Sequence, residues 1–199
     1  MIPIKWMIPI VCFSSSVVAQ STTDLNGLVS AAAHYVSSGM SGARDPETLE
    51  LSKIVGNYGN SFPDVLMTKA TDVQHWTFLY KIKTTPDPTG LPGSDPKPKP
   101  HRAVQAECTQ GIFNNFRYSS SPVTGVKSLE YTWVAVSLDA AIANLNANGY
   151  VRGFSSVELQ RPNLPNWPDD YVYVFTCPWE RRAVGISCQN GSMVWNYGY

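Results

Sequence analysis

Large apolar side chains alternate with smaller or polar ones from Val73 onward, and this alternation constrains the fold more than any other feature of the chain. The apolar positions are Trp76, Phe78, Tyr80 and Ile82, and the positions between them are His75, Thr77, Leu79 and Lys81. Neighbouring side chains of a β-strand point to opposite faces of its sheet, so a period of two predicts a strand with one buried face. The chain is therefore expected to build a sheet that packs on a core.

Other segments are rich in aromatic and β-branched residues and are bounded by glycine, proline or asparagine, a pattern typical of strands. These segments are residues 103–118 with a break near Gly111, 129–136, 153–160, 171–177, 183–188 and, as a further candidate, 193–197.

Two segments show the 3.6-residue period of an amphipathic helix, with a signal at each end. In the first, Thr23 or Asp24 can cap a helix that ends at Gly39, and its apolar positions are Leu25, Leu28, Val29, Ala32 and Val36. In the second, Ser137 is placed as the N-cap and Gly149 as the stop, and the apolar positions are Leu138, Ala141, Ile142 and Leu145.

A third helix is expected between Asp45 and Gly59. Asp45 is a suitable N-cap, and Pro46 follows at the first helical position, where its missing N–H costs nothing. The apolar stripe of this helix would be Leu51, Ile54, Val55 and Tyr58.

The order of these elements predicts an α+β fold with a mainly antiparallel sheet and about three helices on one side of it. Residues 20–199 have the length of a single domain that buries a sizeable core. A period of 20 to 50 residues would indicate a repeat architecture, and none is visible. The pattern does not determine the order of the strands.

The N-terminal segment has the features of a cleaved secretion signal at residues 1–19. Lys5 precedes the short apolar run 6–13, and Val17-Val18-Ala19 forms a small-residue cleavage site. A membrane-spanning helix needs about 20 apolar residues, and this run is shorter and contains Pro9. We therefore expect a soluble protein that is exported to the cell exterior and has no membrane anchor.

Six prolines and two glycines fall within residues 84–100. Proline cannot donate to a strand ladder, so this segment is expected to be an exposed loop inside the single domain.

Composition argues against several classes of function. The chain has 15 basic and 15 acidic residues and no basic run, so it lacks the charge pattern of a nucleic-acid-binding or lipid-binding protein. The histidines, at positions 34, 75 and 101, lack the short spacings of paired metal ligands. No glycine-rich phosphate loop precedes a helix. We expect neither a metal nor a cofactor.

The cysteines that follow the signal, Cys108, Cys177 and Cys188, are odd in number, so one bridge would leave one spare thiol. A Cys177–Cys188 bridge is favoured because these residues lie on consecutive predicted strands joined by a turn; pairing of Cys108 with either one stays open. Asn190-Gly191-Ser192 is a glycosylation sequon in a predicted turn, which makes Asn190 a candidate acceptor.

The last third of the chain is rich in aromatic residues, and three tryptophans lie in or beside turns. These are Trp167, Trp179 and Trp195, and Arg181-Arg182 follows Trp179 closely. Exposed tryptophan beside arginine is typical of protein-binding surfaces. The five residues predict a binding surface for a protein partner, although aromatic residues at strand ends also close a core.

A second hypothesis is a small secreted hydrolase of ribonuclease type. A helix packed on an antiparallel sheet can present histidine, glutamate and arginine on one face for general acid–base cleavage of RNA. His75, Glu107 and Arg117 fall in predicted strands and are the candidates for that chemistry. Glu130 is a further strand carboxylate.

A eukaryotic-style signal, one domain, few cysteines, a proline-rich insertion and no enzyme motif together resemble the small secreted proteins of filamentous fungi. This resemblance covers the whole chain at the level of class. Many proteins of that class are effectors, and it implies a non-catalytic virulence-type protein that acts on a host or extracellular protein.

Overall fold

The computed structural model describes residues 24–40, 48–59, 65–83, 103–163 and 169–199. The predicted secretion signal, the proline-rich segment 84–100, Trp167, Asp45 and Pro46 lie outside the described residues.

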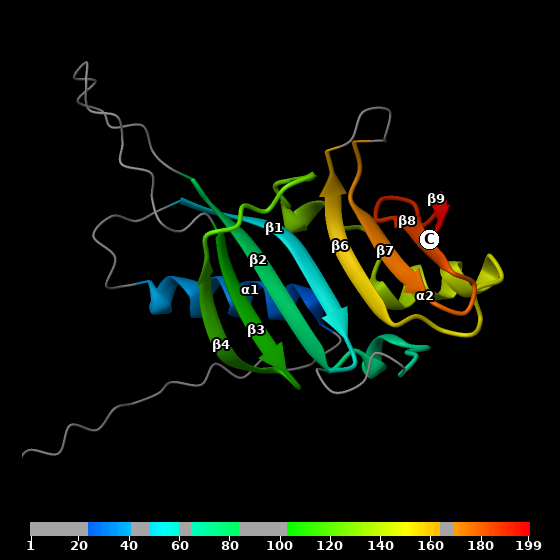
Figure 1. Ribbon diagram of the computed structural model, residues 1–199, viewed down its shortest axis with the longest axis horizontal. Helices are drawn as coiled ribbons and strands as arrows, with labels where there is room; N and C mark the ends of the chain where they lie inside the picture. The colour runs from blue at the N-terminus through cyan, green and yellow to red at the C-terminus, as the bar shows by residue number, and fades with distance from the viewer. Residues whose placement is uncertain (1–23, 41–47, 60–64, 84–102, 164–168) are drawn as a thin grey trace, which may run out of the picture.

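A single antiparallel sheet runs through the molecule in the order β4-β3-β2-β1-β6-β7-β8-β9 (Figure 1). The strands are β1 (Thr48–Asn57), β2 (His75–Lys83), β3 (Ala103–Thr109), β4 (Ile112–Ser119), β6 (Ser156–Pro162), β7 (Val172–Cys177), β8 (Arg182–Ser187) and β9 (Met193–Gly198). A short strand, β5 (Val126–Lys127), pairs with β6 off this path.

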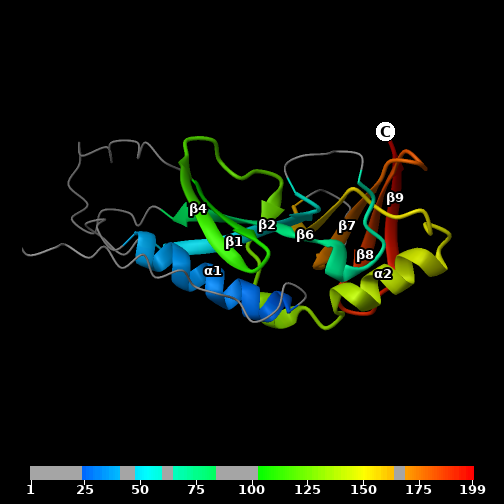
Figure 2. The same ribbon diagram turned by 90° about the horizontal axis from the view of Figure 1, so that it is seen from below.

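Two α-helices, α1 (Leu25–Gly39) and α2 (Leu138–Ala147), cover one face of the sheet (Figure 2). Their buried faces carry the predicted apolar stripes, and the Ser137 hydroxyl caps α2 by accepting from the Ala140 N–H at 3.2 Å. The opposite sheet face, here called the open face, carries no α-helix among the described residues. The predicted α+β fold with a mainly antiparallel sheet is confirmed, with two α-helices in the described part of the chain instead of about three.

The predicted third helix is wrong, because the described part of that segment is β1. The register against β2 shifts between Leu51 and Lys53, which marks a bulge at Ser52. Leu51 and Ile54 therefore face the core although they are three positions apart. A bulge inserts one residue into a period of two, and the resulting spacing imitates a helical stripe.

The predicted strand at 129–136 is also wrong. This segment contains a short 3-10 helix, η2 (Tyr131–Trp133), and then runs to α2. The backbone N–H groups of Ala135 and Val136 both donate to the Cys188 carbonyl, at 3.0 and 2.8 Å. Cys188 lies in the turn after β8, so these two bonds do not belong to a strand ladder.

The order of elements is repeated within the chain. α1 is followed by the meander β1-β2-β3-β4, and α2 is followed by β6-β7-β8-β9. The first strands of the two halves, β1 and β6, pair antiparallel, and both helices lie on the same face. The halves therefore have an approximate twofold arrangement, which leaves β4 and β9 as equivalent edges of the sheet. The two halves share the order of their elements but not their residues, so the sequence shows no repeat.

The predicted Cys177–Cys188 bridge is not formed, and Cys108, Cys177 and Cys188 are all free and buried. Cys177 lies opposite Arg182, whereas the Cys188 N–H donates to Tyr171 at the other end of β7. About 20 Å of strand separates these ends at roughly 3.3 Å per residue, and a disulfide needs Cα atoms within roughly 7 Å. Cys177 ends β7 and Cys188 follows the end of β8, and the ends of two consecutive antiparallel strands lie at opposite ends of the pair.

Thiol titration tests whether Cys108, Cys177 and Cys188 are free. We expect these three thiols to be unreactive in the folded protein, because burial raises the pKa of Cys108 to about 11 and that of Cys177 to about 12. After unfolding without reductant, all three thiols should react. Fewer reactive thiols in the unfolded protein would show that a bridge had formed.

Candidate functional site

Exposed aromatic and arginine side chains gather at one end of the second half of the sheet. They come from the turn before β6, the β7–β8 turn and the end of β9. Trp179 is 65% exposed, Tyr199 is 64% exposed and Val151 is 66% exposed. We call this surface the aromatic–arginine patch, and its members are Val151, Arg152, Trp179, Arg181, Arg182, Tyr197 and Tyr199.

Specific contacts join the three segments of the patch. The Arg152 guanidinium carbon lies 5.6 Å from the centroid of the Trp179 ring, which is within the range of a cation–π contact. The Tyr199 N–H donates to the Arg181 carbonyl at 3.1 Å, and this hydrogen bond connects the end of β9 to the β7–β8 turn. A Cβ atom placed on Gly198 would lie 3.6 Å from Arg182 Nη1, so the guanidinium of Arg182 lies above that glycine.

The patch is positively charged. No ion pair joins Arg152, Arg181 or Arg182 to a carboxylate among the described residues. Glu180 directly precedes Arg181 in sequence, and its Oε2 atom is buried without a hydrogen-bond partner in the described structure. The patch therefore presents arginine charges and aromatic rings to solvent together.

Three of the five predicted binding residues, Trp179, Arg181 and Arg182, come together in this patch. Trp195 does not join them: it is half-buried, and its indole ring covers Gly185, where a Cβ atom would lie 2.6 Å from the ring. Trp167 lies outside the described residues. Sequence reasoning missed Arg152 and Tyr199, because their approach to Trp179 and Arg181 depends on which strand ends meet.

The open face brings together the three residues predicted for ribonuclease chemistry. Glu107 Oε1 accepts from Arg117 Nη2 and from Gln105 Nε2, both at 2.6 Å, and Glu107 Oε2 accepts from Asn115 Nδ2 at 2.7 Å. His75 lies on the neighbouring strand, and its Nδ1 is 3.0 Å from the Thr109 hydroxyl. Glu130 lies apart from this cluster, in the segment before η2.

The cluster is built more like a structural network than like a catalytic site. His75 is 5% exposed and Glu107 is 7% exposed. Burial raises the pKa of Glu107, but the hydrogen bond from Asn115, the charge of Arg117 and weaker contributions from Gln105 and His75 outweigh it, so the pKa is lowered. A carboxylate with three donors and a lowered pKa is a weak general base, since general bases work best near the operating pH.

Glu107→Gln should lower the free energy of unfolding at pH 7 by about 1–3 kcal/mol, because a charge-assisted network is lost. The folded-state pKa is below the ordinary value of about 4.3, so this stabilisation is present above that pH and is lost as the pH falls through the folded pKa. Urea titrations at pH 7, 5 and 3 should show the gap between wild type and variant closing at acid pH. A gap that stays constant with pH would contradict the assignment.

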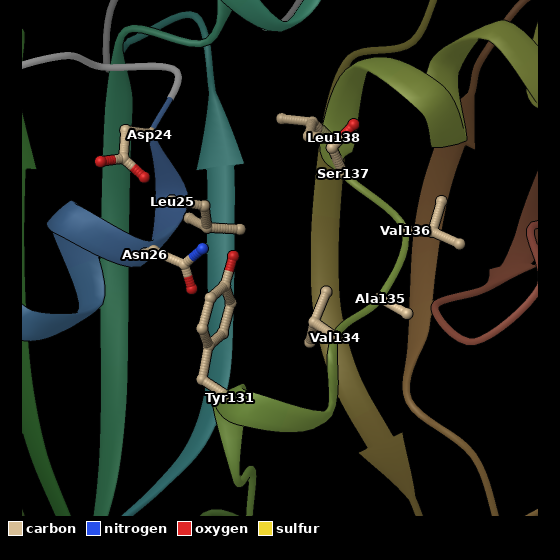
Figure 3. Close-up of a pocket in the computed structure, with 9 residues that line it drawn as sticks. All are labelled: Asp24, Leu25, Asn26, Tyr131, Val134, Ala135, Val136, Ser137 and Leu138. Carbon is tan, nitrogen blue, oxygen red and sulfur yellow. The ribbon is translucent and has the colours of Figure 1, made fainter.

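The described surface includes two small hollows. One, of about 200 Å³, lies between the starts of α1 and α2, and Figure 3 shows lining side chains from both helices and from the segment between η2 and α2. The other, of about 280 Å³, lies beside Lys53, Leu79 and Gln105. Pockets that enclose drug-sized ligands usually measure about 300–1,000 Å³, so neither hollow outweighs the patch as a candidate site.

Within the described ranges, no three histidine, cysteine or acidic side chains are grouped so that they could hold a metal ion. No helix in the same ranges is long and apolar enough to cross a membrane.

Comparisons with known proteins assign the chain to no family. No family model matches it, and no curated protein matches it. Among solved structures, the chain is similar to a protein of Clostridium difficile 630 described as a putative lipoprotein (CD1622), at 6% sequence identity and a TM-score of 0.42. The alignment covers 75% of this chain and 82% of that one.

Proposed function

We propose that this chain is a secreted, non-catalytic interaction protein of effector type, which binds a host or extracellular protein through the aromatic–arginine patch. The observation that carries the proposal is the pairing of exposed Trp179 with Arg152, beside Arg181, Arg182 and Tyr199. Tryptophan, tyrosine and arginine are the residues most enriched among interface hot spots.

The energetics of the patch favour binding over a role in stability. An aromatic ring that is largely exposed adds little to the core, but it loses its contact with water when a partner covers it. Arginine that lacks a carboxylate partner is likewise available for ion pairs across an interface. The partner should therefore present acidic and apolar groups together.

The test is affinity capture from host or environmental extract with wild type and with Trp179→Ala/Arg182→Ala. We expect wild type to capture a stoichiometric protein, and the double variant to lose it by at least tenfold, the result of removing one or two hot spots. Ile112→Ala is the matched control, because Ile112 is also exposed but lies at the opposite edge of the sheet. Equal capture by wild type and the double variant would exclude this surface.

Export forms part of the same proposal and rests on the predicted signal. The protein recovered from culture medium should begin at Gln20, which N-terminal sequencing would show. A product that keeps residues 1–19 would contradict the predicted cleavage.

A ribonuclease-like hydrolase is the second candidate, and the closeness of His75, Glu107 and Arg117 on the open face favours it. Purified protein should then cleave RNA, and His75→Ala should abolish the activity while the fold, followed by circular dichroism, is kept. Absence of cleavage by the folded wild-type protein would exclude this candidate and leave the interaction proposal unaffected.

A further inference from the structure

Strand β9 forms an edge of the sheet that is open to another strand. It is last in the strand order, and no described strand pairs with its outer side (Figure 1). Its six residues, Met-Val-Trp-Asn-Tyr-Gly, include no charge and no proline. Proteins usually protect such edges with charged residues or proline, and the equivalent edge strand β4 carries the exposed Arg117. Strand β9 therefore lacks a common defence against strand addition.

A positive charge lies at one end of this edge. Arg182 is paired in register with Gly198, and its guanidinium lies above that glycine, with no described carboxylate as a partner. Because Gly198 has no side chain, the guanidinium can reach over β9 toward the position where a further strand would lie. Tyr197 and Tyr199, on either side of Gly198, are also exposed, and the alternation of β9 places Tyr197 on the opposite face of the sheet from Arg182.

We propose that the partner binds as an extended acidic segment that adds to β9 as a further antiparallel or parallel strand, with a carboxylate on Arg182. This inference rests on the proposed function and specifies the chemistry of the partner. Backbone hydrogen bonds to β9 would supply affinity, and alternate side chains of the segment would contact Tyr197 on the open face.

Charge complementarity favours a foreign acidic segment over a second copy of this chain. Strand β9 carries no carboxylate side chain, so pairing β9 with another β9 would bring no acidic side chain of that strand to either Arg182 guanidinium. An added strand that is rich in glutamate or aspartate would instead offer a carboxylate that can accept two hydrogen bonds from the Arg182 guanidinium.

The probe is an end-capped ten-residue peptide of alternating valine and glutamate, compared with two analogues. One analogue replaces every glutamate with glutamine. The other is N-methylated at alternate amides and is made in two versions, on odd-numbered and on even-numbered residues, so that each edge of the peptide is blocked from backbone pairing in one version. We expect the acidic peptide to bind and to slow amide exchange in β9, and both analogues to bind at least tenfold more weakly. Arg182→Gln should weaken binding of the acidic peptide by a similar factor. Lys69→Gln, which removes an exposed charge elsewhere, should leave it unchanged.

Three outcomes would overturn this inference. If N-methylated and parent peptides bind equally, strand addition is excluded, while loss of partner capture in Trp179→Ala/Arg182→Ala would still support the proposed function. Failure of the acidic peptide to bind excludes an acidic strand as the ligand. A concentration-dependent dimer of the protein alone, abolished by Met193→Lys, would assign the edge to a second copy.

Discussion

Replacing Phe175 with alanine is expected to lower the free energy of unfolding by about 3–5 kcal/mol, the range for removing a buried aromatic ring from a packed core. Phe175 is fully buried on β7, and its ring centroid lies 4.9 Å from that of Phe154 in an edge-to-face contact. Its strand neighbours, Val157 and Val184, are also buried. The cavity would therefore be enclosed by strands on both sides and would collapse only in part.

Urea denaturation followed by circular dichroism measures this loss. Phe175→Leu is the control, because it keeps most of the side-chain volume and should cost about half as much or less. Tyr118→Ala, at the exposed edge strand β4, should cost less again. Equal small losses for Phe175→Ala and Tyr118→Ala would show that the β7 face is not the core.

Replacing Gly153 with alanine is expected to cost about 2–4 kcal/mol, from a left-handed backbone and a steric clash together. Gly153 has φ of +96°, and an added Cβ atom would lie 2.6 Å from the Met67 carbonyl oxygen. That carbonyl accepts from the Phe154 N–H at 2.9 Å, and the Met67 N–H donates back to Phe154 at 2.8 Å. The substitution would therefore break a two-bond bridge between the segment before β2 and the turn before β6.

Gly149 provides a matched control for the steric part of this prediction. It has φ of +94°, but nothing lies within 4 Å of an added Cβ atom. Gly149→Ala should therefore cost only the backbone strain of about 1–2 kcal/mol. Thermal or urea unfolding of both variants gives the difference, and equal costs would contradict the predicted clash.

The helices and most strands were predictable because their burial follows one period from end to end. In α1 the positions Leu25, Leu28, Ala32 and Val36 are all buried, as the helical stripe requires. In β2 the alternation of Trp76, Phe78 and Tyr80 likewise places these side chains against the core. Local periodicity and burial agree in these elements, so sequence alone identifies them.

The misassigned segments fail for identifiable physical reasons. In β1 the bulge at Ser52 changes the spacing of buried residues from two to three. In 129–136 the aromatic composition is that of a strand, but the hydrogen bonds of Ala135 and Val136 go to a turn carbonyl instead of a ladder. Both depend on partners that are distant in sequence, which local patterns do not reveal.

The candidate site was predictable only in part. Trp179, Arg181 and Arg182 are neighbours in sequence, so their common placement follows from a single turn. Arg152 reaches Trp179 from the turn before β6, and Tyr199 reaches Arg181 from the end of β9. Those contacts depend on the strand order, which the sequence pattern leaves open.

Hydrogen exchange of the protein, free and with its captured partner, tests whether the aromatic–arginine patch is the binding surface. Amides that a partner covers exchange more slowly, and each segment reports separately. We expect slowed exchange in residues 178–182 and 193–199, with residues 105–109 and 112–117 unchanged. Slowed exchange over the His75–Glu107 cluster, with the aromatic–arginine patch unchanged, would show that the binding site is that cluster and not the patch.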